Sequence, residues 1–350
     1  MLHGDGQSLG EVIKSFLLQE HLLTGQRLQK LKGIFNNFLF FLLVSCGGGS
    51  EHNDYARSQQ ISVTAKETNS ITTPLAEGGE DLQAEDRLNY QVVSSRELVS
   101  DGISGIDTYE LIRNFGGPRS LETPDLYLIN HPFMRHIVED TDQSVGHHFV
   151  FKLHRDIDRD RDRGEITDRQ RNEIKTYAQS EDAVKGFEHE IVIFTWKFFI
   201  PAELSLSTRF THFFQLKAVG GNDSQPILTL TGNNESDGDG YEIRHSPHEY
   251  DVDLARVSRS KLDARWMSAY VRVKLSNEGN LRLIVSDLLS EEIVFDIKKE
   301  NIDMWRGTSS EHFVRPKWGI YRSLSDSFNL RPQEEIVRFA DFQISKVKTR

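Results

Sequence analysis

The chain has 350 residues, with 21 Phe, 9 Tyr and 4 Trp to fill a core, and a formal net charge of -11. This acidity argues against a nucleic-acid-binding surface, so any basic row must act locally. The single cysteine excludes a disulfide framework and a cysteine-based zinc site. The length suits one large domain or two small ones.

The region around that cysteine has the pattern of an export signal. Two lysines precede an apolar run, residues 34–44, and Cys46 follows within a Ser-Cys-Gly sequence. This order is typical of a secretory signal peptide, and residues 43–46 resemble the bacterial lipobox. We therefore expect residues 1–46 to be a leader and Cys46 to be lipidated, which predicts a bacterial envelope protein, lipid-anchored or secreted. A buried helix with an inert cysteine is the alternative.

Residues 47–85 are rich in Gly, Ser, Thr, Glu and Asn, which is typical of a flexible linker. From residue 86 to 350, short apolar or alternating runs recur between Gly, Asn, Asp and Pro. They predict strands at 89–93, 126–130, 147–154, 168–177, 189–200, 210–218, 227–231, 241–245, 266–275, 281–286, 293–297, 317–322 and 337–346. Helical patterns are confined to 95–115 and 300–305. This favours an all-β fold, a jelly roll of two antiparallel sheets with a few short helices.

Two charged stretches lie between the predicted strands. Residues 155–163, RDIDRDRDR, alternate in sign, which usually indicates a solvated loop or strand edge. Residues 233–240, NNESDGDG, offer oxygen ligands and glycines without the EF-hand spacing. We interpret them as an acidic turn, with a structural calcium loop as the alternative.

The predicted strand over residues 168–177 is crowded with charge. Because alternate side chains of a strand share a face, Arg169, Arg171, Glu173, Lys175 and Tyr177 point one way. An ordinary half-buried strand alternates apolar with polar residues. This face instead carries a row of cations around one carboxylate, which can bind an anionic ligand. An exposed strand with cross-strand ion pairs is the alternative.

Two further strands present polar rows. On the first, Gln215 and Lys217 share a face. On the second, Lys317 and Tyr321 share a face on either side of Gly319. A glycine inside a strand often marks a close approach by a ligand or by backbone.

These three strands resemble the motifs of the jelly-roll polysaccharide lyases, the group of alginate, glucuronan and heparin-I-type lyases. That family carries R-x-E-x-R (or Lys), then Q-x-H, then K-x-G-x-Y. This chain has RNEIK at 171–175, QLK at 215–217 and KWGIY at 317–321, and the resemblance spans roughly residues 87–346. It implies β-elimination across C4–C5 of a uronate in an acidic polysaccharide, with no required cofactor and no metal in the site.

The resemblance also implies a role for each motif residue. Arg171 and Gln215 would contact the uronate carboxylate, and Tyr321 would lie at the reacting bond. Lys317 would bind substrate or favour the ionised form of Tyr321, because a tyrosine base needs nearby positive charge. Glu173 would orient Arg171. The other substrate-binding residues that we expect are Arg169, Lys175 and Lys217.

The chain departs from the family at the histidine of Q-x-H, where Lys217 stands. Strand parity assigns the nearby His212 to the opposite, core-side face. Two alternatives for the base stay open. Tyr321 serves as both base and acid, which suits syn elimination of glucuronate or mannuronate, or His148 or His154 enters the site from another strand. Both of those histidines also fit an ordinary surface position.

Two other function classes remain. A non-catalytic module that binds acidic polysaccharide would use the same fold. A glycoside hydrolase would need paired carboxylates on one strand face, and no E-x-D-x-x-E occurs. We therefore expect a monomeric polysaccharide lyase whose substrate is an acidic polysaccharide. We expect it not to bind nucleic acid and to contact the membrane only through a lipid anchor.

Overall fold

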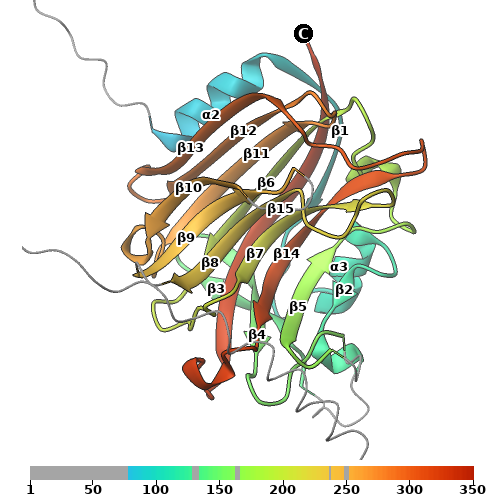
Figure 1. Cartoon of the computed structure of the whole chain (residues 1–350). Coiled ribbons are helices and arrows are strands. Elements are labelled where there is room, and N and C mark those ends of the chain that lie inside the picture. Colours follow the sequence, from blue (N-terminus) through green and yellow to red (C-terminus); the bar gives the residue numbers. More distant parts are fainter. Residues whose placement is uncertain (1–77, 128–133, 162–165, 236–237, 248–251) are drawn as a thin grey trace, which may run out of the picture. The chain divides into compact units, whose positions relative to one another are not determined.

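The structure, a computed structural model, describes residues 78–350 apart from 128–133, 162–165, 236–237 and 248–251. Its strands pair antiparallel in two sheets (Figure 1). The eight-stranded sheet has the order β13–β12–β11–β6–β15–β4–β3, with β1 paired to β15. The seven-stranded sheet has the order β10–β9–β8–β7–β14–β5–β2. The predicted jelly roll is confirmed, while Cys46 and the predicted leader lie outside the described residues.

The strand bounds follow the predicted runs closely. The eight-stranded sheet comprises β1 (Tyr90–Leu98), β3 (Ile137–Asp142), β4 (Gly146–Leu153), β6 (Ile191–Phe199), β11 (Trp266–Lys274), β12 (Gly279–Asp287), β13 (Ile293–Ile302) and β15 (Glu335–Thr349). The seven-stranded sheet comprises β2 (Leu121–Glu122), β5 (Arg169–Lys175), β7 (Thr211–Val219), β8 (Leu228–Glu235), β9 (Gly238–His245), β10 (Val252–Ser258) and β14 (Phe313–Ser323). The sequence patterns do not predict β2, β3 or β10.

Both predicted helical segments need correction. Residues 95–98 end β1, and within the segment 95–115 only α3 (Thr108–Gly116) is an α-helix. It begins after Asp107, whose carboxylate accepts the backbone N–H groups of Tyr109 and Glu110. The segment 300–305 is not helical because β13 continues to Ile302, which pairs with Gly279 of β12. The strand predicted at 126–130 begins with a 3-10 turn, Pro124–Leu126, and its last residues lie outside the described part.

The helix α2 (Gly79–Leu88) lies along the eight-stranded sheet (Figure 1) and begins inside the segment predicted to be a linker. It is held there by charge, because Asp86 pairs with Arg272 of β11 at 2.7 Å and accepts a hydrogen bond from Tyr270 at 2.7 Å. No helix of the described residues is long and apolar enough to cross a membrane.

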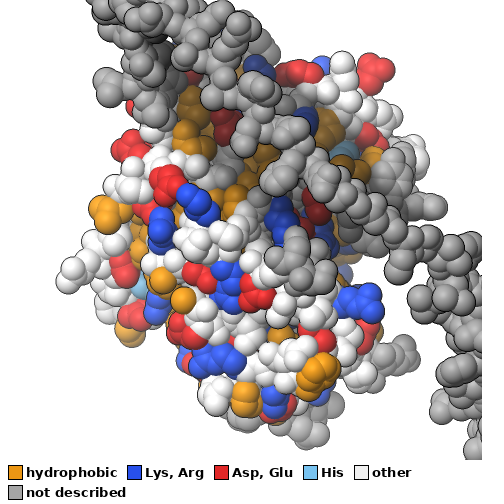
Figure 2. Space-filling view, turned by 60° about the vertical axis from the view of Figure 1, so that its left-hand side comes forward, with side chains coloured by type: hydrophobic (Ala, Val, Ile, Leu, Met, Phe, Trp, Pro, Cys, Tyr) orange, Lys and Arg blue, Asp and Glu red, His pale blue; other side chains and the backbone are white. Residues whose placement is uncertain are grey.

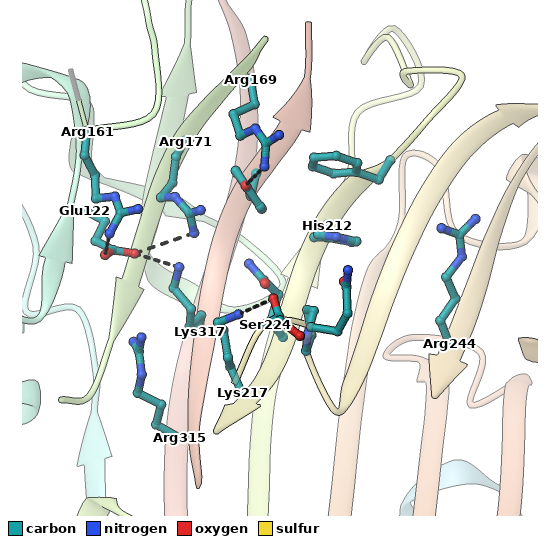
Figure 3. A pocket seen from close by; sticks show the side chains of 15 residues that line it. Glu122, Arg161, Arg169, Arg171, His212, Lys217, Ser224, Arg244, Arg315 and Lys317 are labelled. Atoms are coloured by element: carbon teal, nitrogen blue, oxygen red, sulfur yellow. Dashed lines mark hydrogen bonds and ion pairs between the residues drawn. The ribbon is translucent and has the colours of Figure 1, made fainter. Parts of the chain in front are cut away.

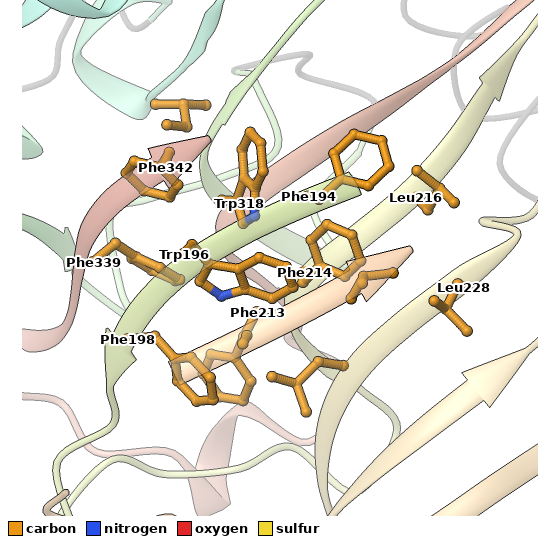
Figure 4. Close-up of a cluster of buried hydrophobic side chains, with 14 of the residues drawn as sticks. Phe194, Trp196, Phe198, Phe213, Phe214, Leu216, Leu228, Trp318, Phe339 and Phe342 are labelled. Atoms are coloured by element: carbon orange, nitrogen blue, oxygen red, sulfur yellow. The ribbon is translucent and has the colours of Figure 1, made fainter. Parts of the chain in front are cut away.

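Aromatic side chains from both sheets meet in the core (Figure 4). Trp196 of β6 stacks on Phe214 of β7 with ring centres 4.5 Å apart, and Trp318 of β14 lies 5.0 Å from Phe342 of β15. All four tryptophans are buried. Trp196, Trp305 and Trp318 belong to the hydrophobic core, whereas Trp266 packs against His148 and Phe199. Because β7 and β14 bury Phe214 and Trp318, their alternate side chains face outward, away from the other sheet.

Candidate active site

A cavity of about 350 Å³ opens on the outward face of the seven-stranded sheet, above β5, β14 and β7 (Figure 3). It contains most of the predicted site residues. Its lining comprises Glu122, Arg161, Arg169, Arg171, Phe210, His212, Gln215, Lys217, Ser224, Gln225, Pro226, Arg244, Arg315, Lys317 and Tyr321. We call it the cationic cavity, because seven of these side chains are Lys or Arg and one is a carboxylate.

This charge distribution is local. On the face shown in Figure 2, basic and acidic side chains are interspersed, and the chain as a whole carries a net charge of -11. A concentration of cations in a concave site raises the local concentration of anions and favours an anionic ligand. The expectation of a local cationic site in an acidic protein therefore agrees with the structure.

Strand β5 supplies the row of charged side chains as predicted, but at two depths. Arg169 and Arg171 line the cationic cavity. Glu173 and Lys175 are buried below it, and Lys175 contacts Glu122 at 2.5 Å. Burial, with smaller contributions from Arg315 and Lys317, lowers the pKa of Lys175 to about 8, although Glu122 acts in the opposite direction. Lys175 is thus a structural partner of Glu122 and does not extend the cavity surface.

Two buried carboxylates anchor the floor. Glu173 accepts hydrogen bonds from Arg171, Gln215 and Lys317. Glu122, from the two-residue strand β2, lies 2.6 Å from the Lys317 ammonium. Burial alone would raise the pKa of Glu122, but Lys317 and Arg171 hold it well below its ordinary value. The cations are therefore held in place as a buried ion network.

The charged run 155–163 contributes to this network, so its prediction as a solvated loop is wrong for two residues. Asp158 and Asp160 are buried. Asp160 accepts Arg171 Nε at 2.8 Å and Nη2 at 3.2 Å, and it also pairs with Arg161 at 2.9 Å. A buried carboxylate needs such partners, and β5 provides one. Arg161 itself reaches the cavity.

Tyr321 is surrounded by basic groups. The Arg171 guanidinium carbon lies 3.6 Å from the ring centre, and Lys317 Nζ lies 5.9 Å from it. Arg169 Nη1 donates to the Tyr321 hydroxyl oxygen at 3.0 Å. Because that oxygen accepts from Arg169, its own proton points elsewhere and can be donated to a ligand.

Gly319 occupies the same strand for a backbone reason. Its φ is +141°, and a Cβ at this position would lie 2.1 Å from the carbonyl oxygen of Asn172 on β5. The close approach that a strand glycine often marks is therefore made here by the backbone of the neighbouring strand. It permits the close approach of β14 and β5 that sets Tyr321 opposite Arg171.

His212 lines the cationic cavity, so the parity prediction that it faces the core is wrong. The cause is an irregularity in β7. Gln215 pairs with Lys317 and His212 with Tyr321, so a step of three residues along β7 matches a step of four along β14. On the other side, the same residues pair with Thr229 and Thr231 of β8, only two apart. A β-bulge of this kind shifts the alternation of side chains.

The His212 ring lies 5.9 Å from the Tyr321 ring, centre to centre, and stacks on Phe210 at 4.7 Å. Its Nδ1 is 2.7 Å from Thr231 Oγ1, which is 2.7 Å from Thr229 Oγ1. Burial first, together with the cations Arg244, Arg171 and Lys317, lowers the pKa of His212 to about 3. The ring is therefore neutral near pH 7 and can accept a proton.

Lys217 and Arg315 differ from the other cations of the cavity. Neither forms an ion pair in contact with a carboxylate of the described residues; Lys217 Nζ contacts the Ser224 carbonyl at 3.2 Å, and Arg315 Nη1 contacts that of Thr176 at 3.3 Å. Arg315 Nε is buried without a hydrogen-bond partner in that part of the chain. Burial, followed by Lys317 and Arg315, lowers the pKa of Lys217 to about 8. Both cations are thus available to an incoming anion.

The structure does not bring His148 or His154 to the cavity. His148 lies on β4 in the eight-stranded sheet, where its ring packs edge-on against Trp266 at 5.4 Å. His154 follows β4 and contacts Asp158 and Glu334.

In the predicted acidic turn, two of the possible calcium ligands already have protein partners. Asn233 donates a hydrogen bond to Glu242, and Asp239 pairs with Arg259.

Sequence reasoning missed Glu122, Asp160, His212, Arg244 and Arg315. Arg315 has the same strand parity as Lys317 and Tyr321, so that signal was present. Glu122 carries no local signal, because its partners are more than 35 residues away in sequence.

No protein-family model matches the chain, and no curated protein matches it. Among solved structures it is similar to an endo-β-1,4-glucuronan lyase from the fungus Trichoderma reesei, with 12% identity and a TM-score of 0.42 over 64% of this chain and 93% of that chain. It is also similar to an alginate lyase from Aplysia kurodai, with 12% identity and a TM-score of 0.44 over 74% of this chain and 100% of that chain. A third similar structure is an alginate lyase from Pseudomonas aeruginosa, with 15% identity and a TM-score of 0.41 over 66% of this chain and 97% of that chain.

Proposed function

We propose that the protein is a polysaccharide lyase that cleaves a uronic-acid polymer by β-elimination. The observation that supports this most is the cationic cavity, in which seven Lys and Arg side chains surround a histidine and a tyrosine. Elimination requires that the uronate carboxylate be neutralised, that a base take the C5 proton, and that an acid protonate O4 as the C4–O4 bond breaks. Each requirement has a candidate group in the cavity.

We assign neutralisation of the reacting uronate's carboxylate to Arg171 and Arg169, the cations beside Tyr321. The Arg171 guanidinium carbon lies 3.6 Å from the Tyr321 ring centre, and Arg169 Nη1 lies 3.0 Å from the Tyr321 hydroxyl oxygen. Positive charge beside that carboxylate makes the C5 proton of the uronate more acidic. Lys217 and Arg315 pair with each other farther along the sheet, five residues from His212 and six from Tyr321, and we assign them to the carboxylate of a neighbouring sugar.

We assign the base to His212 and the acid to Tyr321. His212 is neutral and takes the C5 proton, and the electron pair of that bond forms the C4=C5 double bond. As the C4–O4 bond breaks, O4 takes the hydroxyl proton of Tyr321. This proton points away from Arg169, because Arg169 donates a hydrogen bond to the Tyr321 oxygen. Burial, the largest cause of the low pKa of His212, makes the ring a weak base, and a bound anion offsets only the smaller effect of Arg244, Arg171 and Lys317.

The positions of these two groups bear on the substrate. His212 and Tyr321 lie directly opposite each other on neighbouring strands of one sheet face, so both approach the sugar from the same side. This geometry favours syn elimination. Glucuronate and mannuronate, whose C5 proton and O4 lie on the same side of the ring, are therefore the proposed substrates. Lipid anchoring through Cys46 at the bacterial cell envelope remains part of the proposal.

The test is to incubate the purified chain with glucuronan, alginate, ulvan, hyaluronan and heparin and follow the ultraviolet absorbance of an unsaturated uronate. Tyr321→Phe and His212→Ala should each abolish most of the signal while the protein remains folded. An active His212→Ala variant would instead assign both proton transfers to Tyr321. If a polymer binds tightly and is not cleaved by the wild type, the protein is a binding module on the same fold.

A further inference from the structure

A second cluster of chemically reactive side chains lies where β4 ends, away from the cationic cavity. His136 Nε2 is 3.1 Å from Asp158 Oδ1 and 3.3 Å from His154 Nδ1. His154 Nδ1 is in turn 3.2 Å from Asp158 Oδ2. The side chains of His136 and Asp158 are fully buried, and that of His154 is 15% exposed. Three potential metal ligands thus meet at one point.

We propose that His136, His154 and Asp158 bind one Zn²⁺ ion, with a water molecule as the fourth ligand. In a tetrahedral zinc site with bonds of about 2.0–2.1 Å, neighbouring ligand atoms lie about 3.3 Å apart. The separation of His136 Nε2 from His154 Nδ1, 3.3 Å, matches this spacing. Each imidazole also lies close to one oxygen of the Asp158 carboxylate, His136 at 3.1 Å from Oδ1 and His154 at 3.2 Å from Oδ2. One ligand atom from each residue lies within 4.8 Å of the other two. Two imidazoles and one carboxylate suit zinc, whereas calcium takes about six to eight oxygen ligands.

The outer nitrogen of each imidazole is held as zinc ligands usually are. His136 Nδ1 is 2.9 Å from the Met134 carbonyl oxygen and 3.2 Å from Asp125 Oδ1. His154 Nε2 is 2.9 Å from Glu334 Oε2. Acceptors at these nitrogens keep the ring protons on the outside. The inner nitrogens then present their lone pairs to the same point as the Asp158 carboxylate.

The zinc site would hold β5 in position from its core side. Gln170 Nε2 donates to the His154 carbonyl at 3.2 Å, and Asn172 Nδ2 donates to the His136 carbonyl at 2.8 Å. These two residues flank Arg171, and the Arg171 backbone N–H donates to the Arg159 carbonyl at 3.3 Å, next to Asp158. A metal bound by Asp158 therefore fixes the segment whose next carboxylate, Asp160, orients Arg171. The role is positional and does not depend on the proposed lyase activity.

The test is to strip metal from the purified full chain with a chelator and to titrate it with Zn²⁺ and, separately, with Co²⁺. We expect one equivalent of Zn²⁺ per chain, a higher melting temperature with the ion bound, and a visible Co²⁺ spectrum typical of a tetrahedral site. His154→Ala, the least buried ligand, should abolish all three effects. The control is His147→Ala, which removes an exposed histidine of β4 and should leave all three effects unchanged.

The wild-type titration keeps the test decisive even if His154→Ala does not fold. The proposal is overturned if the wild-type chain binds neither ion and its melting temperature is unchanged by chelator and by zinc. The cluster would then be two histidines hydrogen-bonded to each other and to Asp158. Tight Zn²⁺ binding retained by a folded His154→Ala variant overturns it equally. None of these readouts requires polysaccharide cleavage, so failure of the zinc proposal is distinguishable from failure of the proposed function.

Discussion

The guanidinium group of Arg171 lies over the ring of Tyr321, with its central carbon 3.6 Å from the ring centre. The contact links the buried ion network to the residue that we assign as the acid, since Arg171 is held by Asp160 and Glu173. The position of Tyr321 therefore depends on carboxylates that a substrate does not touch.

Arg171→Lys should separate positioning from charge. Lysine keeps the positive charge beside the buried carboxylates but loses the planar stacking and the two-point contact with Asp160. Because a displacement of about 1 Å in a catalytic group can cost a hundredfold in rate, we expect kcat to fall about a hundredfold with little change in KM. Steady-state kinetics on the cleaved polymer measure this. Arg338→Lys, which removes a similar stacking contact on Phe199, should leave kcat unchanged.

Glu122→Gln should destabilise the fold. The substitution keeps the side-chain size but leaves the buried ammonium groups of Lys175 and Lys317 with less compensation, which should cost about 3 kcal/mol of unfolding free energy. Urea unfolding at pH 7 measures the loss, with the exposed Glu300→Gln as the control.

The difference in unfolding free energy between the wild type and Glu122→Gln should depend on pH. The folded-state pKa of Glu122 lies below its ordinary value of 4.5, so its contribution is complete above that pH and is lost as the pH falls through the folded pKa. The difference in stability between wild type and Glu122→Gln should therefore shrink in acid. A difference that grows below pH 4.5 contradicts the assigned ion network.

Lys217 should set the alkaline limit of substrate capture. Its pKa is lowered to about 8, so the free protein loses this charge as the pH rises through 8. The ratio kcat/KM, which reports the free enzyme, should fall above pH 8, whereas kcat should stay nearly constant because bound anion retains the proton. Lys217→Arg should move the fall to higher pH. Lys299→Met, on the exposed part of β13, should leave the profile unaltered.

Gly319→Ala should damage both stability and activity. A Cβ at Gly319 meets the Asn172 carbonyl, whereas one at Gly238, whose φ is +112°, meets nothing within 4 Å. Both substitutions carry the cost of an unfavourable φ, about 1–3 kcal/mol, so Gly238→Ala is the matched control. We expect Gly319→Ala to cost at least about 1 kcal/mol more in urea unfolding, because the strands must separate. Equal losses would show that the close approach of β14 and β5 contributes nothing.

The sequence was sufficient for the strand framework and for one face of each key strand. Arg171, Lys317 and Tyr321 lie where the two-residue period placed them. His212 was misassigned because a bulge in β7 is set by pairing with β8 and β14, which no local pattern reports. Asp160 was predicted to lie in a solvated loop because its run alternates in charge. Such a run does not indicate that a residue of another strand, here Arg171, will bind the carboxylate. The correct assignment of both required the three-dimensional register.

The mass of the smallest reaction products tests the central claim most directly. Elimination breaks the C4–O4 bond without adding water, so the new non-reducing end should be an unsaturated uronate, lighter by one water molecule than the product of hydrolysis and absorbing in the ultraviolet. We predict this product from a glucuronate or mannuronate polymer with the wild type and its loss with Tyr321→Phe. Saturated products, or full activity of Tyr321→Phe, would contradict the account.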